Sequence, residues 1–139
     1  MTENIAIEIK IVSGAIESAS VEIRRNEKSG TWAMRLDGVE IGEQNFEGQD
    51  LFEAMIGLRH ALEHRDAQLL CVGARPDVFP SGMSRGMGAG RKAYATRMGE
   101  PARRTDLLDI FDYAAPGLVG TVEQQADFHA KWADSLGTR

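Results

Sequence analysis

The chain has 139 residues and a formal net charge of −5, with 42% hydrophobic and 27% charged residues. These values are ordinary for one globular domain and exclude disordered, collagen-like and membrane-spanning classes, since no apolar run approaches the ~18 residues of a transmembrane helix. Cys71 is the only cysteine, which excludes an intramolecular disulfide and a multi-cysteine metal site. The N-terminus lacks a signal-peptide pattern, so we expect a cytosolic protein.

The first forty residues predict an antiparallel meander. Apolar and more polar residues alternate over residues 5–11, which is the period of a strand with one buried face. The alternation returns at residues 21–23 and 32–36. Asp37-Gly38 has the composition of a tight hairpin turn and precedes a further short apolar pair, Val39 and Ile41.

A helix is predicted after this meander, from about residue 50 to residue 64. Apolar residues recur at steps of three and four between Leu51 and Leu62. Asp50, with Glu53 three positions later, resembles a helix N-cap with its capping partner. The continuous apolar run 69–72 then predicts a strand that is covered on both faces.

The rest of the chain begins with an irregular segment at residues 77–90, where prolines remove backbone donors and glycines permit unusual backbone angles. Residues 91–98 and 107–112 have the composition of two more strands. Thr121 then opens a second capping box and starts a helix that Gly137 stops.

Together these elements predict one α+β domain spanning residues 1–139. We expect a mostly antiparallel sheet of about six strands with two helices packed on one face. The large apolar residues expected in the core are Trp32, Phe52, Leu62, Leu70, Ile110, Phe128 and Trp132.

No complete catalytic set is recognisable, and we expect neither an enzyme nor a cofactor. Residues 60–64 match the H-x-x-E-H zinc pattern, but a third ligand is needed and Glu123 is only a nominal candidate. The histidines are better explained as cations near a helix C-terminus, so no metal is expected. Cys71 lies in an apolar run that would suppress its thiolate. His129 has no recognisable nucleophile to activate.

The glycine-rich segment 81–92 is the most unusual part of the chain. It fits neither the P-loop pattern nor a dinucleotide-binding turn. Three interpretations remain open: a structural loop, a protein-binding loop that presents Met83 and Met87, or an anion site built on Arg85, Arg91 and Lys92.

Charge is distributed unevenly along the chain. Residues 37–53 carry six acids and no base, whereas residues 75–104 carry seven bases and two acids. Such blocks either pair within the fold or attract separate partners.

Three segments of the C-terminal half carry a family resemblance. These are S-G-M-S-R-G-M-G-A-G-R-K-A-Y at residues 81–94, L-L-D-I-F-D at 107–112 and T-V-E-Q-Q-A-D-F-H-A-K-W at 121–132. Over residues 68–136 the chain resembles small bacterial immunity proteins encoded beside contact-dependent inhibition or other polymorphic toxins. The resemblance implies a stoichiometric inhibitor of a toxin domain, often a nuclease, and carries over no site residue.

The hypothesis that follows is an immunity protein that binds a cognate toxin, with no direct nucleic-acid or membrane partner. The residues predicted to contact the partner combine the acidic block with the glycine-rich segment: Asp37, Glu40, Glu43, Glu47, Asp50, Met83, Arg85, Met87 and Arg91. The first alternative is a small-molecule or anion-binding protein or enzyme that uses residues 82–92 with Arg75 and Arg97. The second is an oligomerising structural subunit.

Overall fold

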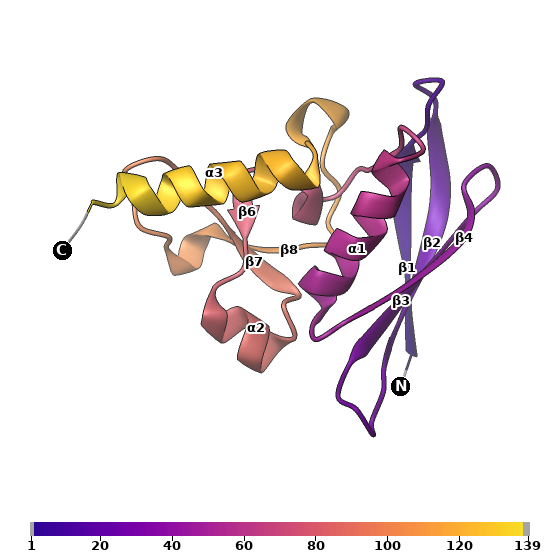
Figure 1. Cartoon of the computed structure of the whole chain (residues 1–139), viewed down its shortest axis with the longest axis horizontal. Helices are drawn as coiled ribbons and strands as arrows, with labels where there is room; N and C mark the ends of the chain where they lie inside the picture. The colour runs from indigo at the N-terminus through magenta and orange to yellow at the C-terminus, as the bar shows by residue number, and fades with distance from the viewer. Residues whose placement is uncertain (1, 138–139) are drawn as a thin grey trace.

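A computed structural model describes residues 2–137, and in this range the chain forms eight strands and three α-helices (Figure 1). The strands build two antiparallel sheets, one of five strands in the order β4-β3-β2-β1-β5 and one of three strands in the order β6-β7-β8. The first sheet contains β1 (Thr2–Lys10), β2 (Ile16–Arg25), β3 (Trp32–Gly38), β4 (Gly42–Gly48) and β5 (Gln68–Leu69). The second contains β6 (Val78–Phe79), β7 (Lys92–Ala95) and β8 (Leu107–Asp109), and the helices are α1 (Leu51–Glu63), α2 (Gly82–Gly88) and α3 (Val122–Ser135).

The five-stranded sheet has one apolar face and one polar face. Ile9, Val21 and Leu36 are fully buried on the inner face, which α1 covers (Figure 1). Their neighbours in sequence point to the opposite face because strand side chains alternate. No helix of residues 2–137 covers that outer face, which carries mainly small and charged side chains.

Helix α1 begins and ends where the sequence predicts. Asp50 is its N-cap, and the carboxylate accepts a 2.7 Å hydrogen bond from the Glu53 backbone N–H. The apolar stripe from Leu51 to Leu62 is buried against the sheet. The second predicted helix is also confirmed, since the Thr121 side chain caps α3 and Gln124 completes the capping box.

The α+β class and the antiparallel pairing are confirmed, but the expected single sheet is wrong. The strands are divided between two sheets, and α1 and α3 pack on different ones: α1 on the first sheet, α3 over β6. Of the predicted core residues, Phe52, Leu62, Leu70 and Ile110 are almost completely buried. The three others, Trp32, Phe128 and Trp132, are half-buried.

The hairpin between β3 and β4 differs from the prediction. Gly38 still belongs to β3 and pairs with Gly42, so the turn is residues 39–41 instead of Asp37-Gly38. Gly42 has φ = +74°, a left-handed conformation that closes three-residue hairpin loops. The strand after the hairpin was predicted at Val39 and Ile41, but these residues form the turn and the strand is β4, whose polar sequence without β-branched residues gave only a weak signal.

Two later segments also differ from their predictions. Residues 77–90 are not irregular, because they contain β6 and the short helix α2. The run 69–72 is strand only at its beginning: Cys71 forms an isolated bridge with Tyr113, and a 3₁₀ turn follows at Val72–Ala74. Within residues 2–137, no helix combines the length and apolar character needed to cross a membrane.

Candidate protein-binding surface

Four of the predicted contact residues gather on the hairpin formed by β3 and β4. Asp37 and Glu43 are directly opposite each other on the two strands, Glu40 lies in the turn, and Glu47 follows on the same face as Glu43. All four are exposed. Like charges placed directly opposite in a sheet are destabilising, so this arrangement weakens the hairpin. We call these four residues the acidic hairpin.

One base of the described chain reaches the acidic hairpin: the Arg65 guanidinium donates to the backbone carbonyl of Ile41 in the turn at 2.6 Å. Within residues 2–137 none of its four carboxylates lies in an ion pair. The nearest base in the strand register, Arg35, lies instead 3.9 Å from Glu22 on the neighbouring strand. An excess of negative charge therefore faces solvent along the edge of the sheet formed by β3 and β4.

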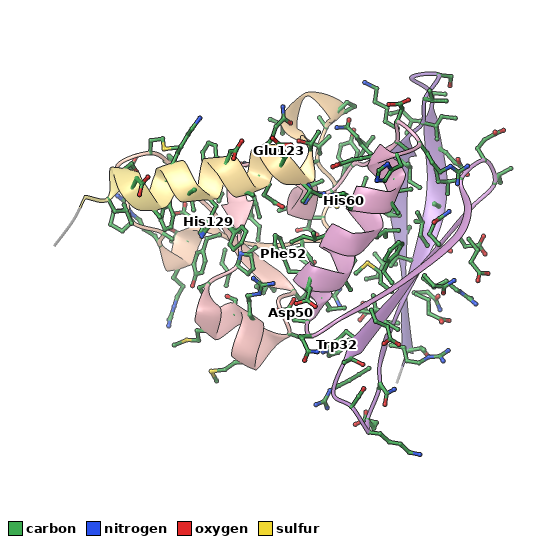
Figure 2. The ribbon with its side chains drawn as sticks, in the orientation of Figure 1. Trp32, Asp50, Phe52, His60, Glu123 and His129 are labelled. Atoms are coloured by element: carbon green, nitrogen blue, oxygen red, sulfur yellow. The ribbon has the colours of Figure 1, made fainter. Side chains whose placement is uncertain are left out.

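Asp50 does not belong to this surface. It is only 6% exposed, and besides capping α1 its carboxylate accepts a 2.8 Å hydrogen bond from Nε of Arg85. In Figure 2, Asp50 and Phe52 lie at the start of α1, beside α2. The six acids of this block thus separate into four exposed residues on the hairpin, the buried Asp50 and the exposed Glu53 in the first turn of α1.

Part of the glycine-rich segment forms the helix α2, which exposes two methionines to solvent. The Ser81 hydroxyl caps the helix by accepting a hydrogen bond from Ser84 N–H. The Arg85 guanidinium is held by Asp50 and lies 5.5 Å from the centre of the Phe52 ring. Met83 and Met87 are left 73% and 85% exposed, respectively. Flexible methionines at the surface suit adaptable protein contacts.

A groove of about 630 Å³ runs between α2 and the ends of β2 and β3. Trp32, Leu51 and Met87 contribute apolar surface to it, and Arg85 and Arg91 also line it. Three of the predicted contact residues therefore share one concave site, which lies apart from the acidic hairpin.

The basic block is largely neutralised within the fold. Arg91 donates to both carboxylate oxygens of Glu3, at 2.8 and 3.1 Å, and its Nε donates to Asp109 at 3.1 Å. These contacts raise the pKa of Arg91 and lower the pKa of Glu3, the Arg91–Glu3 hydrogen bonds being the main cause in both cases. The other ion pairs of the block are Arg75–Asp77, Arg85–Asp50, Arg97–Asp106 and Arg103–Glu100.

A buried polar cluster joins α1, α3 and the loop between the sheets, and sequence patterns did not reveal it. Arg59 is 3% exposed and donates to the Gln125 side-chain oxygen at 2.6 Å and to the carbonyls of Gly73 and Gly120. Gln125 is 1% exposed, and its amide donates to the carbonyls of Gly73, Arg75 and Val78. Burial lowers the pKa of Arg59. The only sequence signal was a polar residue on each apolar helix stripe.

The H-x-x-E-H motif does not form a metal centre in the described chain. His60 on α1 and His64, the C-cap of α1, are both exposed, and Glu63 accepts a hydrogen bond from the Val122 backbone N–H. Glu123, the nominal third ligand, lies in the first turn of α3 (Figure 2). Among residues 2–137, no three His, Cys, Asp or Glu side chains are grouped closely enough to hold a metal ion.

Cys71 and His129 occupy structural environments. Cys71 is fully buried beside Met55, and desolvation raises the pKa of its thiol to about 11. The His129 ring stacks on Phe79 at 3.8 Å between centroids, and partial burial lowers its pKa. Both environments disfavour the charged form that nucleophilic or cationic chemistry would use.

No protein-family model matches the chain, and no curated protein shows significant similarity to it.

Proposed function

We propose that this chain is an immunity protein, a stoichiometric inhibitor that captures a cognate bacterial toxin domain by surface contact. The observation that carries the proposal is the acidic hairpin, whose four exposed carboxylates have no counter-ion within residues 2–137. A surface that places Asp37 opposite Glu43 costs stability. A basic binding partner would offset this cost.

A nuclease toxin is the partner class that this surface suits best. Nucleases hold phosphates with clusters of Lys and Arg, so their active-site clefts are electropositive. Complementary charge accelerates association by one to three orders of magnitude and places the acidic hairpin against that cleft. The exposed Met83 and Met87 on α2 would add an apolar contact at a second point.

The alternative of an anion site is less well supported, because the arginines that would form it already lie in ion pairs. Arg75, Arg85, Arg91 and Arg97 each have a carboxylate partner at 2.7 to 3.2 Å. An incoming anion would have to displace these carboxylates and would be repelled by them. We therefore favour protein capture over anion binding.

The proposal is tested by titrating the chain against the toxin domain encoded by the neighbouring gene. We expect a 1:1 complex with submicromolar affinity. The double variant Glu43→Gln with Glu47→Gln should associate roughly tenfold more slowly at low ionic strength.

The matched control is Glu123→Gln with Asp127→Asn, which makes the same change in net charge on exposed residues of α3. Its association rate should stay close to that of the unmodified chain. Absence of submicromolar binding would contradict the proposal. Equal slowing of association in both double variants would show that the acidic hairpin has no specific role in binding.

A further inference from the structure

One edge of β1 is open over half of its length. β1 pairs with β2 from Thr2 to Lys10, but on its other side it pairs with β5 only at Ile9 and Lys10. Leu70 N–H still donates to the Glu8 carbonyl at 2.8 Å, and then the chain turns away so that Cys71 pairs with Tyr113. No described strand therefore lies beside residues 4–7 of β1 on this side.

The register shows which backbone groups face the open edge. Ile11 N–H donates to the Ala15 carbonyl on the β2 side, so the odd-numbered residues of β1 direct their backbone groups toward β2. The Leu70-to-Glu8 bond shows the converse, because an even-numbered residue accepts on the β5 side. The N–H and C=O groups of Asn4 and Ala6 therefore point into the open edge and remain available to a further strand.

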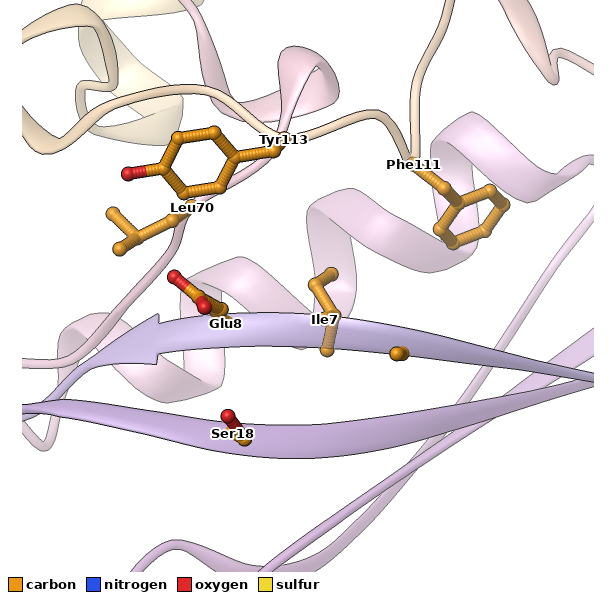
Figure 3. A pocket seen from close by; sticks show the side chains of 7 residues that line it. Ile7, Glu8, Ser18, Leu70, Phe111 and Tyr113 are labelled. Carbon is orange, nitrogen blue, oxygen red and sulfur yellow. The ribbon is translucent and has the colours of Figure 1, made fainter.

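The part of this edge at Ala6 and Ile7 lies in a groove of about 520 Å³ (Figure 3). Ala6, Ile7 and Glu8 form its β1 wall, and Phe111 and Tyr113 lie across from them. The free groups at this edge are main-chain N–H and C=O groups in strand register. They suit an extended chain, which offers matching main-chain groups, whereas a helix uses its own within the helix.

Both ends of the open edge are closed by contacts within the fold. β5 occupies the end at Ile9, and the bidentate contact between Arg91 and Glu3 closes the other end. Residues 4–7 between these ends correspond to about 13 Å of strand. We call this segment, with Phe111 and Tyr113, the β1 notch.

We propose that the β1 notch binds an extended, basic segment of a protein partner as an additional strand of the five-stranded sheet. Main-chain hydrogen bonds to Asn4 and Ala6 supply the attachment, as in other cases of strand addition. The Glu8 carboxylate, which has no ion-pair partner within residues 2–137, faces the groove and selects Lys or Arg (Figure 3). Tyr113 is 60% exposed and packs on the apolar part of the segment.

A second copy of this chain fits the β1 notch less well than a single segment. Pairing two β1 edges would bring together the closing contacts at Ile9 and at Glu3 of both copies, along with two Tyr113 side chains. A free extended segment of four or five residues meets none of these obstacles. The inference concerns the mode of binding and does not require the partner to be a toxin.

The test uses the full chain, labelled with ¹⁵N, and the blocked peptide acetyl-Lys-Val-Lys-Val-Lys-Val-Lys-amide as probe. We expect saturable chemical-shift changes at the amides of Asn4, Ala6 and Glu8 and at Tyr113, with slower hydrogen exchange at Ala6. Ala6→Pro should weaken peptide binding at least roughly tenfold, since it removes a main-chain donor. Glu8→Gln should weaken it by a smaller factor.

Asn45→Pro is the matched control. The Asn26 N–H donates to the Thr31 carbonyl, so the odd-numbered residues of β3 direct their backbone groups toward β2 and the even-numbered ones toward β4. Met34 and Leu36 therefore bond with their even-numbered partners on β4, and the backbone groups of the odd-numbered Asn45 point to the free edge of β4. Both prolines thus lie on edge positions that spare the ladder. Asn45→Pro should leave peptide binding unchanged.

Three outcomes would overturn the inference. The first is no saturable change up to millimolar peptide. The second is a set of shifts confined to the acidic hairpin, which would show charge attraction without strand addition. The third is self-association of the chain through β1 in the absence of peptide, which would assign the edge to a second copy.

Discussion

Arg59 and Gln125 show how much of this fold depends on individual polar residues. Together they donate to four backbone carbonyls, those of Gly73, Gly120, Arg75 and Val78. Buried carbonyls without donors each cost a desolvation penalty. The two side chains thus allow an irregular backbone segment to pass through the interior between the sheets.

Replacing Arg59 by Met should destabilise the chain by about 3–5 kcal/mol, because it leaves buried hydrogen-bonding groups without their charged partner. Urea unfolding monitored by circular dichroism measures the change. Lys131→Met, at an exposed position of α3, is the control and should stay within about 0.5 kcal/mol of the unmodified chain. A change below 1 kcal/mol in Arg59→Met would contradict the role assigned to this cluster.

Cys71 predicts a dependence of stability on alkaline pH. Its pKa is raised from 9.0 to about 11 in the folded chain by burial, so above pH 9 the unfolded chain releases a proton that the folded chain retains. The contribution of the protonated thiol to the free energy of unfolding is therefore complete below pH 9 and is lost as pH rises toward 11. The difference in unfolding free energy between the unmodified chain and Cys71→Ala should shrink over this interval. If this difference in unfolding free energy stayed constant from pH 8 to pH 11, the predicted effect of the buried thiol would be wrong.

At the scale of elements, α2 is the least self-sufficient helix. It has seven residues, three of them glycines, and none of its residues is buried. Glycine is a poor helix former and a helix of two turns is unstable alone. Its attachment rests on Arg85, which reaches Asp50 and the Phe52 ring, and on the Leu51 N–H bond to the Ala89 carbonyl.

Arg85→Met should therefore loosen α2 while leaving α1 intact. Amide exchange should accelerate within residues 82–90 and remain unchanged in the middle of α1. Asp50→Asn should have a similar effect on α2 because it keeps the cap of α1 but removes the charge. Asp50→Ala should in addition cost roughly 1 kcal/mol through loss of the cap. Unchanged exchange in α2 for all three variants would rule out the anchoring role.

At the scale of the whole molecule, Arg91 connects the two sheets. It lies directly before β7, pairs with Asp109 on β8 and reaches Glu3 on β1, and its guanidinium is 5.2 Å from the centre of the Phe111 ring. The Arg91 contact with Glu3 also closes one end of the β1 notch. The Arg91 side chain thus links the two sheets and also limits the length of the open edge of β1.

Arg91→Met should increase amide exchange at residues 2–5 and 107–111, where the sheets meet. Exchange in β3 should be unaffected, because its ladder partners are β2 and β4 and it does not pair with β1. Lys92→Met, at the next and exposed position, is the control. Equal exchange in both variants would show that the sheets are joined without Arg91.

Local patterns in the sequence determined the elements with strong signals. The alternation at residues 5–11, the apolar stripe 51–62 and the caps at Asp50 and Thr121 predicted β1, α1 and α3, since each pattern involves residues only a few positions apart. The strand β4 was misplaced and the helix α2 was missed, because polar and glycine-rich segments carry weak intrinsic preferences and take their form from the elements beside them.

What the tertiary structure alone decided is which residues meet. The sequence contained the acidic and basic blocks, but an arginine that pairs internally looks the same in a sequence as one that stays free. Arg91 reaches Glu3 across 88 positions, and Arg59 reaches Gln125 across 66. The division into two sheets, the neutralised basic block and the open edge of β1 all arise from such distant contacts, which leave no periodic trace in the chain.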